Sequence, residues 1–69
     1  MASTVERAVS GMRRVDYVRM VEGDRPRFFV VGVGHRLPVE REISASVALE
    51  LLEMVPCRYD RPRVDRVVA

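Results

Sequence analysis

Two side chains of this 69-residue chain could take part in acid–base or thiol chemistry: its single histidine, His35, and its single cysteine, Cys57. Imidazole is the usual general base near neutral pH, and a thiolate beside a base is a common nucleophile. The other candidate nucleophile is Ser44. The spacing of Cys57 or Ser44 from His35 does not indicate a catalytic pair. We therefore expect no enzyme. A catalytic or redox protein centred on His35 or Cys57 is the least favoured alternative.

Metal and disulfide chemistry are limited by the same two residues. A structural zinc site usually needs four ligands, so one histidine and one cysteine could hold a metal only by sharing it across a dimer. We expect neither a metal nor a cofactor. An unpaired cysteine is typical of a reducing interior, and the chain has no long apolar run and no signal-like start. These features predict a cytoplasmic protein with no membrane partner.

The sequence Gly32-Val33-Gly34 follows an apolar run, as a phosphate-binding loop would. A dinucleotide fingerprint needs a third glycine where Leu37 stands and a helix that opens at once, and Pro38 intervenes. A phosphate loop also needs a lysine, which the chain lacks. The two glycines are better explained as flexible residues that end a strand. No small-molecule substrate is evident.

The apolar pattern of residues 27–55 predicts the central part of the fold, including the strands that hold Gly32, Gly34 and His35 in place. The run 28–33 suits a central strand covered on both faces. Turn-forming residues 22–26 join 15–21 to a second strand over 27–33 as a hairpin. Residues 37–43 alternate in polarity, and Pro38 indicates that this strand is an edge or starts late.

Two helices are expected. Ser3-Thr4-Val5-Glu6 fits a capping box, and the helix it opens should end near Gly11. Ser44 can cap a second helix that runs to Met54 and is stopped by Pro56.

The fold class is therefore α+β, with the order α-β-β-β-α and a C-terminal strand left open. We expect a single domain over 1–69, with a folded core over 3–55 and a basic tail or terminal strand over 56–69. The economical arrangement is an antiparallel three-stranded meander with the helices packed on one face. A chain this short buries only about 60% of its unfolded surface, which favours a homodimer.

This order of elements is similar to that of double-stranded-RNA-binding domains, over about residues 3–55, and to that of other small α+β folds. The resemblance implies a basic cluster at the start of the last helix, where phosphates are gripped. The matching positions 44–47 read Ser-Ala-Ser-Val and carry no cation. Because these positions differ from the family pattern, the chain lacks the basic residues with which such domains contact RNA phosphates.

The second helix has more apolar surface than one sheet contact needs. Helical spacing puts Val47, Ala48, Leu51, Leu52 and Val55 on one face, and further apolar residues widen the arc well beyond about 100°. We interpret the excess as a surface for another protein or for a second copy of the chain. The predicted contact residues are Leu49, Leu52 and Met54, with Glu50, Glu53 and neighbouring arginines as a charged rim. An adaptor, an accessory subunit or a regulator would fit.

Nucleic-acid binding is the alternative. All twelve basic residues are arginines, and residues 56–69 carry four arginines against two aspartates, 4 − 2 = +2. The guanidinium group of arginine can donate two hydrogen bonds to a phosphate. Asp60 and Asp65 interrupt the basic stretch, however, and few aromatic residues accompany it. Residues 34–38 also resemble, over five positions, the Pro-containing turn of swapped-hairpin DNA-binding dimers. The candidate phosphate contacts are Arg13, Arg14, Arg58, Arg61, Arg63 and Arg66.

Overall fold

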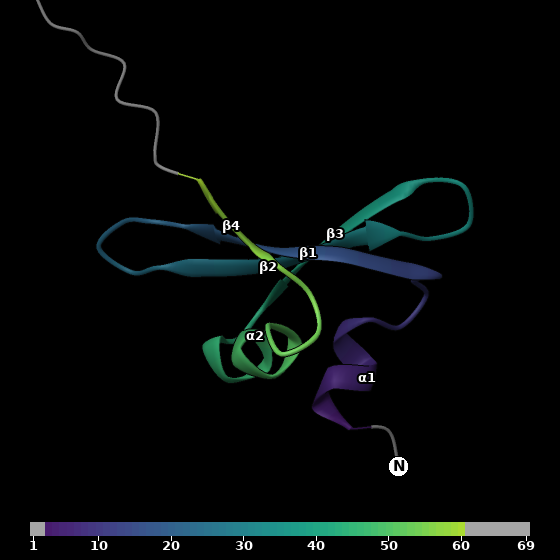
Figure 1. Cartoon of the computed structure of the whole chain (residues 1–69), viewed down its shortest axis with the longest axis horizontal. Coiled ribbons are helices and arrows are strands. Elements are labelled where there is room, and N and C mark those ends of the chain that lie inside the picture. Colours follow the sequence, from purple (N-terminus) through teal and green to yellow (C-terminus); the bar gives the residue numbers. More distant parts are fainter. Residues whose placement is uncertain (1–2, 61–69) are drawn as a thin grey trace, which may run out of the picture.

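The computed structural model describes residues 3–60, which form one four-stranded sheet with two helices on the same face (Figure 1). The expected α+β class, the antiparallel meander and the one-sided helices are confirmed. In chain order the elements are α1 (Thr4–Ala8), β1 (Arg14–Val21), β2 (Arg27–Val33), β3 (Pro38–Ile43), α2 (Ala45–Leu51) and β4 (Cys57–Asp60).

The capping box at the start of α1 forms as the sequence predicts. The Ser3 hydroxyl accepts a hydrogen bond from the Glu6 amide at 3.0 Å, and the Ser3 amide donates to the Glu6 carboxylate at 2.8 Å. Both bonds satisfy backbone donors that the first turn leaves without helical partners. The helix ends at Ala8, and the chain turns through Gly11 at a φ of 83°, a conformation that glycine adopts without strain.

The meander pairs β1 with β2 and β2 with β3, both antiparallel. Val18 lies opposite Val30, which lies opposite Arg41 of β3. The turn over residues 22–26 joins the predicted hairpin strands, and β2 has the predicted bounds. Strand β3 alternates between exposed and half-buried residues and lies at the sheet edge, as its alternation and Pro38 predict.

The strand left open at the C-terminal end of the sequence is present. Strand β4 lies next to β1 and runs parallel to it, so the sheet order is β3-β2-β1-β4. Cys57 lies beside Val18, and Tyr59 beside Met20. The first part of the predicted tail is therefore a strand of the sheet, while 61–69 lie outside the described residues.

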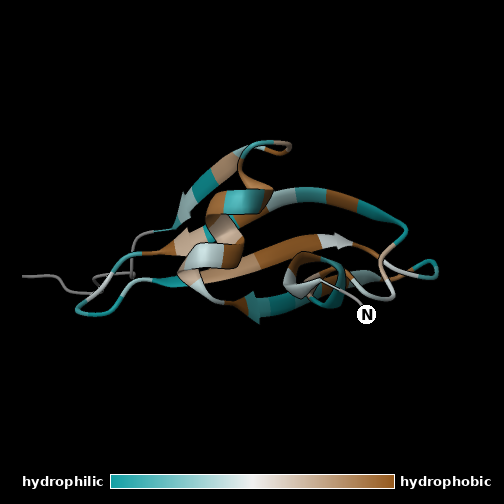
Figure 2. Ribbon diagram, turned by 90° about the horizontal axis from the view of Figure 1, so that it is seen from below, coloured by the Kyte–Doolittle hydropathy of each residue, from teal (hydrophilic) through white to brown (hydrophobic). Residues whose placement is uncertain are grey.

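The core lies between the sheet and the helices. Val18 and Val30 are fully buried at the centre of the helix-facing side of the sheet. The helices contribute Ala8 from α1 and Val47, Ala48 and Leu51 from α2. Figure 2, seen from the helix side, shows both helices in front of the sheet. This small apolar cluster, with the half-buried residues around it, fixes how α2 lies on the sheet.

The prediction that β2 is covered on both faces is wrong. Phe28, Val30 and Gly32 face the helices, whereas Phe29, Val31 and Val33 alternate onto the other face, over which no helix lies within residues 3–60. A continuous apolar run is typical of a doubly covered strand. Here the guanidinium groups of Arg19 and Arg27 lie over the Phe29 ring, and all three residues of the second set are half-buried.

Helix α2 is shorter than predicted. Ser44 caps it, because its hydroxyl accepts from the Val47 amide at 3.3 Å. The helix ends at Leu51 rather than at Met54, and Pro56 is not its terminator. The amides of Met54 and Val55 both donate to the Leu51 carbonyl, at 2.9 and 3.0 Å. This tightened turn redirects the chain towards β4.

Candidate interaction surfaces

The candidate nucleophiles and the histidine are not brought together. His35 is exposed in the β2–β3 turn, whereas Cys57 is half-buried at the start of β4, level with Val30 in the sheet. His35 lies beyond the end of β2, so it is at least about 10 Å farther along the sheet than Cys57. The Ser44 hydroxyl caps α2.

The Gly34–Pro38 segment is a turn that leads into a strand. The Gly34 amide donates to the Leu37 carbonyl at 2.8 Å, and Arg36 takes a positive φ of 72°. The resemblance to a swapped-hairpin module would need a short helix after Pro38, and Pro38 begins β3 instead.

The two glycines of Gly32-Val33-Gly34 are required for space rather than for flexibility, which corrects the sequence interpretation. Neither has a positive φ. A Cβ atom on Gly32 would overlap the Arg14 carbonyl oxygen, beside the bulge at which β1 shifts register. A Cβ atom on Gly34 would lie 2.8 Å from Cγ2 of Val39. Close backbone approach therefore explains both residues.

The face of the sheet opposite the helices, here called the open face, carries a network of ion pairs. Arg19 donates to Glu40 at 2.7 Å and to Asp60 at 2.9 Å, which links β3, β1 and β4. Arg27 donates two hydrogen bonds to Glu42, at 3.0 and 2.9 Å. These bonds raise the pKa of Arg27 and lower that of Glu42, because each charged form is stabilised by its partner. The two glutamates of β3, Glu40 and Glu42, are thus both paired with arginines of neighbouring strands.

Aromatic rings lie under the arginines of the open face. The guanidinium carbons of Arg19 and Arg27 lie 4.6 and 5.2 Å from the Phe29 ring centroid. Arg58 stacks in the same way on Tyr17, at 4.8 Å. Cation–π contacts of this kind are worth about 0.5–1 kcal/mol at exposed sites. They hold these guanidinium groups against the sheet.

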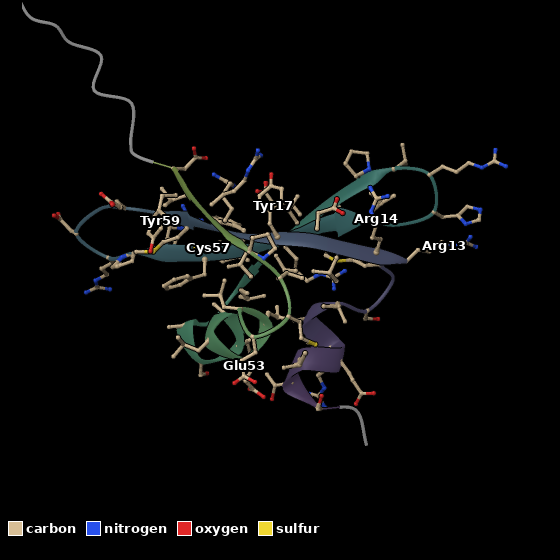
Figure 3. All side chains as sticks on the ribbon, in the orientation of Figure 1. Arg13, Arg14, Tyr17, Glu53, Cys57 and Tyr59 are labelled. Carbon is tan, nitrogen blue, oxygen red and sulfur yellow. The ribbon has the colours of Figure 1, made fainter. Side chains whose placement is uncertain are left out.

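The predicted nucleic-acid residues do not form one patch within residues 3–60. Arg13 and Arg14 lie at the start of β1, near the β2–β3 turn, and Arg14 pairs with Asp16 at 2.7 Å (Figure 3). Arg58 lies beside Arg19, towards the other end of β1, in the wall of a shallow hollow of about 270 Å³. Arg61, Arg63 and Arg66 lie outside the described residues.

Two of the three predicted contact residues of the second helix are exposed. Leu49 is 68% exposed and Met54 is 71% exposed. Leu52, the third, is not exposed as expected, because it is half-buried and packs against the core. Leu49 and Glu50 lie near the end of α2, whereas Glu53 and Met54 lie in the tight turn that follows it, and Figure 3 shows Glu53 on the side of α2 away from the sheet. We call these four residues, Leu49, Glu50, Glu53 and Met54, the α2 surface.

A row of apolar side chains crosses the helix-facing side of the sheet at the level of the β1–β2 hairpin. Strand pairing places Ile43 opposite Phe28, Phe28 opposite Met20, and Met20 beside Tyr59. The first three are half-buried, whereas Tyr59 is 66% exposed at the sheet edge. The sequence did not indicate that Tyr59 belongs to this row. The only signal was its place between two charged residues, which becomes informative once β4 is known to be a strand.

Comparison of the chain with protein-family models, curated proteins and solved structures gives no match. No helix within residues 3–60 is long and apolar enough to cross a membrane. In the same part of the chain, no three His, Cys, Asp or Glu side chains gather where they could hold a metal ion.

Proposed function

We propose that this protein is a non-enzymatic, cytoplasmic protein-interaction module that binds a partner protein through the α2 surface. The exposure of Leu49 supports this proposal most directly. A leucine that is 68% exposed on a helix whose neighbouring residues build the core leaves apolar area in water. Burial of Leu49 and Met54 against a partner would remove that area from water.

The charge of the α2 surface indicates the chemistry of the partner. Glu50 and Glu53 lie beside the two exposed apolar residues, and helix α2 has no basic residue in its last turn. No ion pair joins either glutamate to another side chain within residues 3–60. The matching partner surface presents apolar side chains flanked by lysine or arginine.

Self-association through the same helix is disfavoured by the same charges. Two copies of α2 packed against each other about a twofold axis would place the acidic residues of one copy near those of the other. Like charges that meet across an interface cost free energy. We therefore assign the α2 surface to a different protein with a basic rim.

The test compares two leucines of equal exposure. Leu37, in the β2–β3 turn, is 68% exposed, as Leu49 is. The tagged full chain is purified from its own cells as wild type, Leu49→Glu and Leu37→Glu, and the proteins that accompany each variant are quantified. We expect a partner that is lost with Leu49→Glu, retained with Leu37→Glu, and lost again when Glu50 and Glu53 are both changed to Arg. Equal retention by all the variants would overturn the proposal.

A further inference from the structure

The outer edge of β4 offers backbone hydrogen-bonding groups that no strand within residues 3–60 takes up. The carbonyls of Pro56 and Asp60 accept from the Val18 and Glu22 amides of the β1 side, at 2.9 and 3.1 Å. Alternate residues of a strand direct their backbone groups to opposite edges. Tyr59 is one residue from Asp60 and three residues from Pro56, both of which bond to β1. The amide and carbonyl of Tyr59 therefore point away from β1.

The two edges of the sheet differ in how they are protected. Strand β3 begins with Pro38, and its Arg41 side chain turns towards α1, where it donates to the Ala8 carbonyl at 2.7 Å. Proline and inward-pointing charged residues are devices that keep edge strands from pairing with other chains. Strand β4, which reads Cys-Arg-Tyr-Asp, is short, but it contains neither a proline nor a charged side chain that points inward. Within residues 3–60, the outer edge of β4 is thus open to a further strand.

From this edge we infer that a second copy of the chain pairs with β4, antiparallel, about a twofold axis at Tyr59. In this register the two Tyr59 residues exchange backbone hydrogen bonds. Their side chains extend the apolar row, so that Ile43, Phe28, Met20 and Tyr59 of one copy continue into the same residues of the other. The exposed ring of Tyr59 gains a ring of its own kind as neighbour.

Charge favours the same register. Arg58 and Asp60 share the open face with Arg19. With the axis at Tyr59, Arg58 of each copy lies opposite Asp60 of the other, which gives two complementary pairs. An axis at Arg58 would instead place the two Arg58 residues opposite each other. The sequence of β4 is therefore complementary to itself in one register and repulsive in the other.

The paired strands are short, so the dimer should be weak. Stable interfaces bury about 1,600 Å² in total, more than two four-residue strands and two tyrosines provide. We expect a monomer–dimer equilibrium that depends on concentration. Because this interface uses β4 and not the α2 surface, its failure would leave the proposed function untouched.

Sedimentation velocity of the full chain over a range of concentrations tests the inference. Tyr59→Pro removes the outward amide without touching a hydrogen bond to β1, and we expect it to weaken the dimer at least tenfold. Leu49→Glu serves as the matched control and should leave the dimer intact. A wild-type chain that stays monomeric throughout, or a dimer lost with Leu49→Glu and kept with Tyr59→Pro, would overturn the inference.

A charge-exchange experiment keeps the inference testable should Tyr59→Pro disturb the fold. Arg58→Asp gives a chain with two acidic residues in β4, and Asp60→Arg gives one with two basic residues. We expect each variant alone to be monomeric and an equimolar mixture to form a heterodimer, with Arg25→Asp, an exposed turn residue, as the charge control. Dimers of either variant alone, or a mixture that stays monomeric, would contradict the register.

Discussion

Nη1 of Arg41 donates a hydrogen bond to the carbonyl oxygen of Ala8 at 2.7 Å and a second to that of Arg7 at 3.2 Å. Arg41 lies on edge strand β3, and the two carbonyls belong to the last turn of α1. Carbonyls at a helix C-terminus lack helical partners and carry partial negative charge. One side chain thus satisfies the end of α1 and ties the helix to the sheet.

Removal of these donors should loosen α1. Arg41→Met keeps an unbranched stem and loses both hydrogen bonds, and we expect a decrease of about 1–2 kcal/mol in the free energy of unfolding. Urea unfolding followed by circular dichroism measures it. Arg36→Met, in the exposed β2–β3 turn, is the control and should be near neutral. An unchanged midpoint for Arg41→Met would show that α1 docks without this contact.

The two glycine positions Gly32 and Gly23 should respond very differently to alanine. A Cβ atom at Gly32 would overlap the Arg14 carbonyl, whereas one at Gly23 meets nothing within 4 Å. Gly32→Ala should therefore force β1 and β2 apart and cost about 2 kcal/mol or more, a typical cost of overpacking. Gly23→Ala should change stability by less than about 0.5 kcal/mol. Similar thermal midpoints for the two variants would refute close approach as the reason for Gly32.

Local chemistry explains which elements could be predicted. The hairpin was predictable because residues 22–26 combine Gly, Asp and Pro between two β-rich runs, and α1 because its capping box is read directly from Ser3 and Glu6. The end of α2 was not predictable, since the apolar residues after Leu51 continue the helical pattern. Instead, Leu52 and Val55 pack against the core, and Met54 lies in the turn that leads to β4.

Features that depend on strand register were beyond the sequence. Arg19 meets Glu40 and Asp60 only because β3 and β4 lie on either side of the β1–β2 pair. The parallel position of β4 rests on contacts between residues about forty positions apart, which no local pattern encodes. The exposure of Tyr59 follows from that position. The β4 edge thus needed the structure, whereas the four residues of the α2 surface were all named from the sequence.

The Arg27–Glu42 pair should make the free energy of unfolding depend on pH in the acidic range. Hydrogen bonds from Arg27 hold the pKa of Glu42 below its unfolded value. The stability from this pair is therefore fully present above the unfolded pKa, about 4.3, and is lost as the pH falls through the lower folded pKa. NMR titration of the Glu42 carboxyl should show this low pKa in the wild type and a higher one in Arg27→Gln. The Arg25→Gln control should match the wild type, and an ordinary pKa in the wild type would argue that the pair does not persist in solution.

Nucleic-acid binding remains a prediction of the arginine pattern, and salt dependence tests it. Each phosphate that an arginine neutralises on duplex DNA contributes about −0.9 to the slope of log affinity against log salt. Because Arg14 is paired with Asp16 and lies far along β1 from Arg58, we expect little binding even at low salt. Fluorescence anisotropy with random-sequence duplex DNA and duplex RNA measures it. Strong binding that falls steeply with salt, and that is lost when Arg61, Arg63 and Arg66 become Gln, would move the function to the tail.

Site-specific photo-crosslinking tests the central claim, that the α2 surface binds a protein with a basic rim. A photoreactive amino acid replaces either Leu49 or the equally exposed Leu37 of the full chain, and irradiation takes place in the cells of origin. The account predicts one dominant crosslinked protein from position 49, none from position 37, and loss of the product when Glu50 and Glu53 become Arg. Identical products from positions 49 and 37, or none from either, would contradict it.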